Sequence, residues 1–202
     1  MTESDSPNAA GVSLEPPIIT ISGHLVALGP LRRDLLALYQ RWMNDISTVR
    51  NLAVVPGPVT IEAEAAWYDR VAVSSDVLFT IYERATWRPI GNTGLHEIDY
   101  RHRTAEFGIL IGEADARGKG YGTETTRLML DYAFTALGLH NVMLRVYAYN
   151  RAAYRAYQKA GFREFGRRRE AVWMGGRLWD AIYMECLATE FESPELGSAL
   201  AP

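Results

Sequence analysis

The sequence has little cysteine, no long apolar run and no strong excess of charge of one sign. Its one cysteine, Cys186, excludes a framework of internal disulfides and any zinc cluster built on several thiolates. No apolar run approaches the roughly 18 residues of a membrane-spanning helix, and residues 1–17 lack the apolar core of a secretion signal. The formal net charge of −3 gives no general reason to bind nucleic acid or an anionic membrane surface. We therefore expect a cytoplasmic protein whose partners are neither nucleic acid nor membrane.

The remaining composition is typical of one globular domain. Of the 202 residues, 48% are hydrophobic and 22% are charged, which is enough to fill one substantial core. Residues 1–17 and 192–202 are polar and rich in Ser, Pro and Gly, so both are predicted to be flexible tails. No repeat or linker divides the rest, and a single domain is expected over residues 18–191. The four histidines show no metal-ligand spacing, so no metal site is predicted.

The hydrophobic period changes repeatedly along this domain. Short apolar stretches predict strands at about 24–28, 77–82, 89–98, 104–112, 141–148, 162–174 and 177–187. Apolar residues at helical spacing predict helices at about 31–44, 60–73, 122–137 and 150–161. Thr60 and Asn150 are predicted N-caps, and Gly175-Gly176 a two-residue hairpin turn. The pattern predicts an α/β (α+β) fold with a sheet of six or seven strands and about four helices.

A glycine-rich segment, Arg117-Gly118-Lys119-Gly120-Tyr121-Gly122-Thr123, separates a predicted strand from a predicted helix. Three glycines in five residues leave the backbone N–H groups unshielded, and the following helix directs the positive end of its dipole at the same place. The segment is therefore a candidate cradle for phosphate or pyrophosphate. It is not a P-loop, because Lys119 is followed by glycine, and it lacks the third glycine of a dinucleotide-binding fingerprint.

The same segment and a second one resemble the GNAT N-acetyltransferases. The run from Ala105 to Glu124 is similar to their acetyl-CoA signature, whose core is [QR]-x-x-G-x-[GA]. A second block matches the pattern N-x-x-A-x-x-x-Y-x-x-x-G-F through Asn150, Ala153, Tyr157, Gly161 and Phe162. Both blocks stand in the family's order and spacing.

Two weaker matches extend the resemblance over about residues 22–190. Ile90-Gly91, Leu95 and Ile98-Asp99 are similar to a strand of the family. The terminal hairpin with Gly176 and Asp180 resembles the branch that acts on ribosomal-protein N-termini, spermidine and some antibiotics. The resemblance implies a single GNAT-type domain with a mixed, mostly antiparallel sheet.

The activity implied is transfer of an acetyl group from acetyl-CoA to a primary amine, by direct attack in a ternary complex. In that family the pyrophosphate lies on the amides of the glycine loop, here Arg117, Gly118, Lys119, Gly120, Tyr121, Gly122 and Thr123. The pantetheine arm bonds along the preceding strand, here Ile109, Leu110 and Ile111, and Asn150 contacts the arm. Unpaired strand amides suit such an arm, as in β-augmentation.

Acetyl transfer needs a neutral nitrogen, donors for the oxyanion and a proton for the leaving thiolate. Tyr157 is the candidate acid, because a phenol with a pKa of about 10 can protonate a thiolate; the alternative is packing within the helix stripe. Glu106 is the candidate base, which in the family acts through water; the alternative is a solvated or salt-bridged carboxylate. The resemblance also implies the backbone N–H of Leu110 as the oxyanion donor.

Four nearby residues allow two interpretations each. His96 is a further candidate base, although a single histidine on a strand is more often structural. Glu97 and Asp99 could bind a cationic substrate or simply be solvated. Glu124 is expected to cap main-chain amides and not to take part in the chemistry.

Two sets of arginines in the last third of the sequence need separate interpretations. Arg163, Arg167, Arg168 and Arg169 form a basic cluster, which is predicted to be a charged strand edge and not a nucleic-acid site. Arg151 or Arg155 could contact the 3′-phosphate of CoA.

The acceptor stays open between a small amine (a polyamine, an amino sugar or an antibiotic) and a protein N-terminus. The helices at about 31–44 and 60–73 would wall the acceptor side, and their Trp42, Trp67 and Tyr68 suit stacking or, more commonly, core packing. These helices carry no acidic cluster of the kind found in a strongly polycation-selective site, which counts against spermidine without excluding it. The alternative function is a catalytically silent acyl-CoA-binding protein on the same fold. A homodimer is expected only by analogy with this branch.

Overall fold

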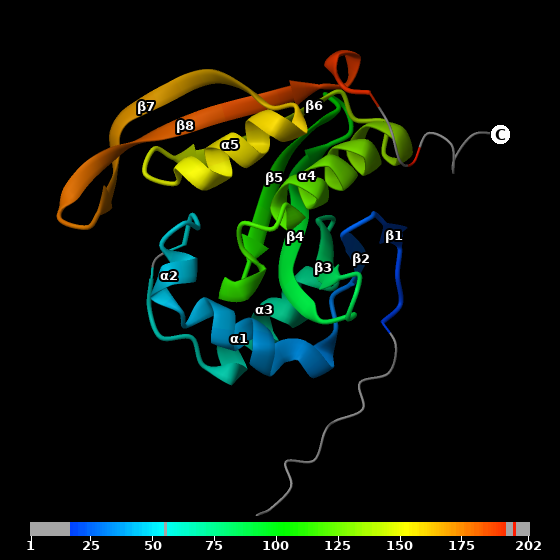
Figure 1. Cartoon of the computed structure of the whole chain (residues 1–202), viewed down its shortest axis with the longest axis vertical. Helices are drawn as coiled ribbons and strands as arrows, with labels where there is room; N and C mark the ends of the chain where they lie inside the picture. The colour runs from blue at the N-terminus through cyan, green and yellow to red at the C-terminus, as the bar shows by residue number, and fades with distance from the viewer. Residues whose placement is uncertain (1–16, 55, 193–195, 197–202) are drawn as a thin grey trace, which may run out of the picture.

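Eight strands form one sheet in the computed structural model, which describes residues 17–54, 56–192 and 196 (Figure 1). The strands are β1 (Ile21–Ser22), β2 (Val26–Pro30), β3 (Val77–Glu83), β4 (Pro89–Asp99), β5 (Thr104–Ile111), β6 (Asn141–Tyr147), β7 (Arg163–Met174) and β8 (Arg177–Leu187). Their order across the sheet is β1-β2-β3-β4-β5-β6-β8-β7, and every neighbouring pair except β5 with β6 is antiparallel. The predicted α/β class is confirmed. The additional strand is β1, whose two residues are too few to show a hydrophobic period.

Five α-helices lie in the described part of the chain. They are α1 (Leu36–Met43), α2 (Ile46–Val49), α3 (Ile61–Val71), α4 (Tyr121–Asp131) and α5 (Arg151–Ala160). A π-helical turn, Tyr132–Ala136, continues α4, and 3₁₀ turns occur at Arg33–Leu35, Ala114–Ala116 and Ala188–Glu190. The sequence did not predict α2, because four residues make barely one helical turn.

The predicted caps and turns are confirmed. The Thr60 hydroxyl accepts a hydrogen bond from the Ala63 N–H at 3.2 Å, and the Asn150 side chain accepts one from the Ala153 N–H at 3.2 Å. Gly175-Gly176 makes the turn between β7 and β8 with φ angles of 62° and 78°. These left-handed angles are those of a type I′ hairpin, where glycine avoids a steric penalty.

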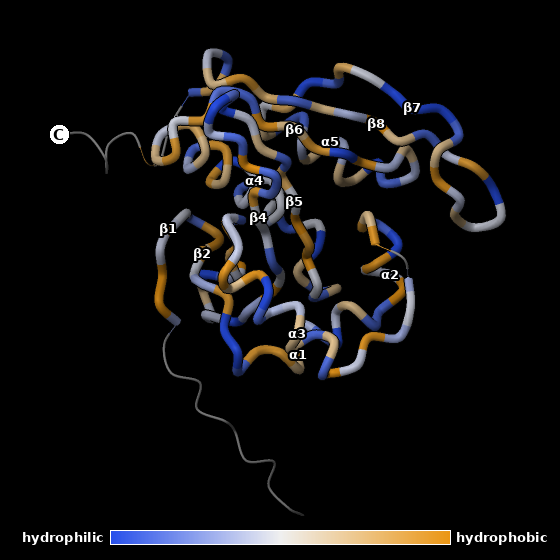
Figure 2. The backbone as a smooth tube through the Cα atoms, turned by 180° about the vertical axis from the view of Figure 1, so that it is seen from behind, coloured by the Kyte–Doolittle hydropathy of each residue, from blue (hydrophilic) through white to orange (hydrophobic). Residues whose placement is uncertain are grey.

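The core is divided between the two faces of the sheet. The larger cluster joins α4 to inward residues of the strands, including Leu95, Phe107 and Leu144. The smaller cluster lies on the opposite face, where Tyr39 and Trp42 of α1 pack with other side chains. Helices therefore pack on both faces of the central strands. Hydrophobic and hydrophilic residues alternate along these strands in Figure 2.

The β7–β8 hairpin extends away from the rest of the fold (Figure 1). β7 is the outer strand of the sheet and most of its residues are exposed. Its arginines include Arg163, which pairs with Glu190 at 2.7 Å, and Arg167, which pairs with Glu164 at 2.5 Å. The cluster thus lies on a charged outer strand, which protects a sheet edge from unwanted pairing.

Two remaining predictions concern the ends of the chain and membranes. The flexible tails expected over residues 1–17 and 192–202 lie outside the described residues, apart from Pro17, Glu192 and Leu196. Among the residues described, no helix has the length and apolar character needed to cross a bilayer.

Candidate active site

β5 separates from β6 partway along its length. The two strands pair only where Thr104–Glu106 runs beside Asn141–Met143, whereas β5 pairs with β4 as far as Ile111. In the described chain, no strand covers the other edge of residues 107–111. This open edge offers the backbone N–H and C=O groups of an unpaired strand to a ligand that binds as an added strand.

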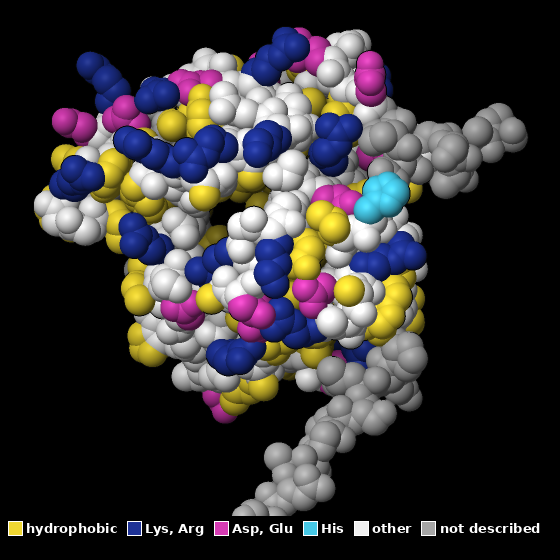
Figure 3. Space-filling view, viewed as in Figure 1, with side chains coloured by type: hydrophobic (Ala, Val, Ile, Leu, Met, Phe, Trp, Pro, Cys, Tyr) yellow, Lys and Arg dark blue, Asp and Glu magenta, His cyan; other side chains and the backbone are white. Residues whose placement is uncertain are grey.

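A cavity of about 390 Å³ lies beside this open edge. Its walls come from β5, the glycine segment, the first turn of α4, α5 and the segment around α2. Figure 3 shows the hollow from outside, between the part of the molecule that holds α5 and the part that holds α2. One extended ligand can therefore contact the glycine segment and the open strand together.

The glycine segment closes one end of the cavity with main-chain atoms. Gly118 and Gly120 have φ angles of 77° and 89°, which L side chains rarely adopt, and α4 begins at Tyr121. A Cβ built on Gly118 would meet no atom within 4 Å, so the space over the loop is open. The free N–H groups and the dipole of the 11-residue α4 favour an anion at this point.

Most of the predicted cofactor-binding residues line this cavity: Ile109, Leu110, Ile111, Arg117, Gly118, Gly120, Gly122, Thr123 and Asn150. Lys119 and Tyr121 do not. The Tyr121 hydroxyl donates instead to Glu83 Oε1 at 2.6 Å, so the predicted contact of Tyr121 depends on its backbone amide. Lys119 is exposed, and its predicted contact depends on the backbone in the same way.

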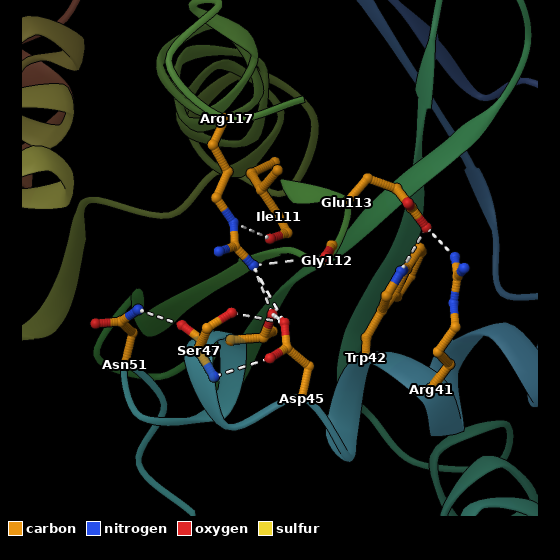
Figure 4. A network of polar contacts seen from close by, with 10 residues as sticks. Arg41, Trp42, Asp45, Ser47, Asn51, Ile111, Gly112, Glu113 and Arg117 are labelled. Carbon is orange, nitrogen blue, oxygen red and sulfur yellow. Dashed lines mark hydrogen bonds and ion pairs between the residues drawn. The ribbon is translucent and has the colours of Figure 1, made fainter. Parts of the chain in front are cut away.

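The Arg117 side chain turns toward α2 (Figure 4). Its Nε donates to the Ile111 carbonyl at 3.1 Å. A terminal nitrogen donates to the Thr48 hydroxyl and lies 4.0 Å from Asp45 Oδ2. Asp45 also caps α2 by accepting from the Ser47 N–H at 2.9 Å. Arg117 therefore holds α2 against the end of β5 and completes a wall of the cavity, a role that its place in the glycine motif did not predict.

Tyr157 reaches the cavity from α5 with aromatic rings behind it. Its ring lies 6.2 Å from that of Phe107 and 6.1 Å from that of Phe162, both nearly edge-on. Burial raises the pKa of Tyr157 above its ordinary value, so the phenol is protonated at neutral pH. The residue therefore packs against the core and also presents a protonated group to the cavity.

Glu106 lies on the other face of the sheet and does not line the cavity. Its neighbour Phe107 is buried in the larger core, whereas Leu110 packs against the cluster of Tyr39 and Trp42. Because side chains alternate along a strand, Glu106 and Leu110 share the face that α1 covers. Glu106 is half-buried. The candidate base therefore faces the side where the sequence predicts the acceptor.

Glu124 binds main-chain amides, as predicted, but those of another element. Its carboxylate accepts from the N–H groups of His24 at 2.9 Å, Leu25 at 2.7 Å and Val26 at 2.7 Å. The contact ties the first turn of α4 to the turn between β1 and β2. Glu124 thus stabilises the helix whose N-terminus faces the cavity, without lining the cavity itself.

Cationic side chains line the α5 side of the cavity. Arg155 and Lys159 belong to this wall and Arg151 does not, so the expected 3′-phosphate contact is better met by Arg155. Sequence reasoning missed Lys159, although its spacing of four residues from Arg155 places both on one helix face. Figure 3 shows Lys and Arg side chains along the rim of the hollow.

The wall around α2 was also missed. Thr48, Asn51 and Leu52 line the cavity, and no sequence pattern predicted them.

On the acceptor side, Trp42 is buried and its indole N–H donates to Glu113 Oε1 at 2.8 Å. Trp67 packs edge-on against Tyr39. The packing interpretation of these two tryptophans therefore agrees with the structure.

Comparison with known families identifies the activity that this geometry serves. Residues 26–163, more than half of the chain, match the family model described as the acetyltransferase (GNAT) domain. The chain belongs to the GNAT acetyltransferases. It is therefore an enzyme that transfers an acetyl group from acetyl-CoA to an amine, and the alternative of a silent binding protein is not supported.

Individual relatives of this GNAT domain include polyamine enzymes. The spermidine N(1)-acetyltransferase of Escherichia coli K12 is 31% identical over 163 residues, which cover 81% of this chain and 86% of that relative. The putative ribosomal N-acetyltransferase YdaF of Bacillus subtilis is 31% identical over 102 residues, 50% of this chain and 55% of that relative. The Vibrio cholerae spermidine N-acetyltransferase in complex with CoA and spermine has a TM-score of 0.76 at 28% identity, covering 82% of this chain and 97% of that one.

The cavity of the GNAT domain fits acetyl-CoA in three chemical respects. The glycine loop and the N-terminus of α4 offer amides to a diphosphate. The open edge of β5 offers hydrogen bonds to an amide-rich arm. Arg155 and Lys159 supply positive charge for a further phosphate.

Proposed function

We propose that this GNAT enzyme acetylates a primary amine of a polyamine such as spermidine or spermine. The observation that carries the proposal is the likeness to the Vibrio cholerae enzyme in complex with CoA and spermine, which extends over 97% of that chain. The Escherichia coli relative, a spermidine N(1)-acetyltransferase, is similar over 86% of its length. Neither similarity is confined to the acetyl-CoA motif, so both include the elements that form the acceptor side.

The charges of the acceptor side support a cationic substrate. The helices that wall it carry no acidic cluster, but the strands supply carboxylates. Glu106 lies on β5, its register partner is His96 on β4, and His96 contacts Asp76, which precedes β3. Within the described chain, no hydrogen bond or ion pair engages the Glu106 carboxylate. An unneutralised carboxylate attracts an ammonium group.

Residue roles follow the same proposal. Tyr157, whose raised pKa keeps it protonated, gives its proton to the departing thiolate of CoA. Glu106 holds or deprotonates the acceptor on the other face of β5. The glycine segment with Asn150 binds CoA.

The resemblance implies the Leu110 N–H as oxyanion donor, but the Gly112 N–H donates to the Ile90 carbonyl on the β4 side, and main-chain groups alternate in direction along a strand. The Leu110 N–H therefore also faces β4, and the N–H of Ile109, which faces the open edge, donates to the oxyanion instead.

The test is a panel of acceptors incubated with acetyl-CoA. Release of free CoA thiol and the mass of the product are followed for spermidine, spermine, an amino sugar and a peptide with a free N-terminus. We expect acetylspermidine or acetylspermine as the main product. Reaction with the peptide and not with the polyamines would overturn the proposed substrate class.

The Tyr157→Phe variant tests the acid. General acids contribute typically about 100-fold or more to a rate, so we expect a fall of that size in kcat. The heat of acetyl-CoA binding should change little, because only a hydroxyl is removed. Unchanged turnover would remove Tyr157 from the mechanism.

The homodimer implied by the resemblance also remains a proposal. It is supported by exposed apolar side chains on the β7–β8 hairpin, Phe165 at 54%, Trp173 at 68% and Leu178 at 49% of full exposure, beside the unpaired outer edge of β7. A second copy of the chain would cover both. Sedimentation analysis should find a dimer that Trp173→Ser weakens; a monomer at every concentration would contradict this proposal.

A further inference from the structure

His96 lies on the acceptor face of β4 and is held by a carboxylate. Its Nδ1 is 3.2 Å from Asp76 Oδ2. The ring lies over two glycines that are register partners, Gly94 on β4 and Gly108 on β5. A Cβ built on Gly94 would be 3.3 Å from His96 Nε2, and one built on Gly108 would be 3.4 Å from the same atom. The absence of side chains at both positions allows the ring to lie close over the sheet.

The position of Gly108 on β5 places the His96 ring beside the part of the strand that is not paired with β6. β5 pairs with β6 only up to Glu106, so Gly108 belongs to the open segment that adjoins the cavity. Ile109, whose N–H faces the open edge, is the next residue along the same strand. On the opposite face, the Tyr157 ring contacts Phe107 at 6.2 Å between centroids. A proton donor and an imidazole therefore flank one short stretch of β5 from its two faces.

Acetylation of a polyamine needs a group that accepts a proton from the amine. An alkylammonium has a pKa of about 10.4, so at neutral pH the nitrogen must lose a proton before or during attack. Imidazole is the side chain most often used for proton transfer near neutral pH. A carboxylate on Nδ1 fixes the tautomer in which Nε2 carries a lone pair and can accept a proton.

We propose that His96, oriented by Asp76, accepts the proton of the acceptor amine at Nε2, while Glu106 holds the cationic substrate. This proposal rests on the proposed function and refines the choice of base. The nitrogen forms a bond to the acetyl carbonyl carbon, and the carbon–sulfur bond of the thioester breaks. The ammonium passes one proton to His96 Nε2 before attack, the nitrogen releases a second proton to solvent as the amide forms, and Tyr157 gives one proton to the sulfur. His96 then releases its proton to solvent and Tyr157 regains one, so that one proton is released per turnover.

The charged groups beside His96 belong to three segments. Asp76 precedes β3 and contacts the ring directly. Glu106 is the register partner on β5. Glu97 follows on β4, where a positive φ of 50° marks an irregularity in the strand, and its side chain is exposed. All three are acidic, which favours a cationic acceptor.

The first test compares two histidines of the same hairpin. His102 also contacts an aspartate, with its Nδ1 2.8 Å from Asp99 Oδ2, but it lies in the turn between β4 and β5. We expect His96→Gln to lower kcat/KM for spermidine at neutral pH by about 100-fold or more, and His102→Gln to leave it unchanged. The heat of acetyl-CoA binding should be the same for both variants.

The pH dependence separates proton transfer from packing. As the pH rises toward the pKa of the amine, more of the acceptor is already neutral, so the deficit of His96→Gln should shrink. A deficit that is the same at every pH, or wild-type activity in His96→Gln, would overturn the assignment of His96.

Asp76 is a positioning residue and needs a readout besides activity. In the wild type, ¹⁵N chemical shifts of the His96 ring should show the tautomer with the proton on Nδ1, and Asp76→Asn should show a mixture. We expect kcat to fall in Asp76→Asn with little change in the KM for acetyl-CoA, and partial rescue in Asp76→Glu. An unchanged tautomer with an unchanged kcat would contradict this role.

The outcomes also separate this proposal from the proposed function. Failure of the wild-type enzyme to acetylate spermidine or spermine would overturn the substrate class alone. The ratio of wild-type to His96→Gln activity is then measured with the amine of the panel that does react, and a ratio near one overturns the role of His96.

Discussion

The indole of Trp42 lies directly against the backbone of Gly112. A Cβ built on Gly112 would be 2.2 Å from Trp42 Cδ2, closer than any real contact. Trp42 belongs to α1 and Gly112 follows β5, so this contact brings the acceptor-side helix onto the strand that borders the cavity. Only glycine permits so close an approach.

This contact gives the first prediction. Gly112→Ala forces Trp42 or the strand to move, and overpacking of this kind typically costs about 1–3 kcal/mol. Urea unfolding should show the loss. Gly57→Ala is the control, because a Cβ there meets nothing within 4 Å, and its free energy of unfolding should change little. Equal stability of the two variants would mean that Trp42 is not packed as described.

The second prediction concerns the link between Arg117 and α2. Arg117→Leu removes the donors to Ile111 and Thr48 and loosens a wall of the cavity. We expect the Kd for acetyl-CoA to rise several-fold in a calorimetric titration. Arg41→Leu is the control, because Arg41 pairs with Glu113 outside the cavity (Figure 4). A Kd that rises equally in both variants would contradict the specific role of Arg117.

The third prediction separates stability from binding at Glu124. Glu124→Gln weakens three charge-assisted hydrogen bonds to the turn before β2, and the free energy of unfolding should fall by about 1–3 kcal/mol. The Kd for acetyl-CoA should stay close to that of the wild type when measured well below the melting temperature. A specific loss of binding without a loss of stability would show that Glu124 contacts the cofactor.

The fourth prediction is an alkaline loss of stability due to Tyr39. Burial raises the pKa of Tyr39 to about 12, above the value of about 10 in an unfolded chain. The resulting stabilisation is complete below about pH 10 and is lost as the pH rises through 12, an effect of about 2–3 kcal/mol. Tyr39→Phe should therefore be less sensitive to pH between 10 and 12, although it lacks the hydrogen bond to Thr80. The exposed Tyr100 provides the control variant, Tyr100→Phe. Equal pH dependence in all three proteins would contradict the prediction.

The features predictable from the sequence are those set by neighbouring residues. Thr60 and Asn150 are helix caps, Gly175-Gly176 is a hairpin turn, and the glycine segment begins a helix, because each depends on a few consecutive positions. The direction of the Arg117 side chain was not predictable, because its partner Thr48 is 69 residues away in the sequence.

The acceptor side depends even more on long-range register. The sequence marks His96 only as a single histidine on a strand. Its placement over Gly108 requires the pairing of β4 with β5, and its contact with Asp76 requires the pairing of β3 with β4. The separation of β5 from β6 is likewise a property of the sheet. No local pattern in residues 104–111 predicts where the two strands separate.

The central claim is that the glycine loop and the open edge of β5 bind acetyl-CoA. The most direct test is a calorimetric titration of acetyl-CoA into the wild-type protein and into Gly120→Val. Gly120 has a φ of 89°, and a Cβ there would lie 3.5 Å from Leu25 Cδ1, so valine should distort the loop. We predict saturable binding to one site in the wild type and much weaker binding in a folded Gly120→Val variant. No heat of binding in the wild type, or equal affinity in both proteins, would contradict the account.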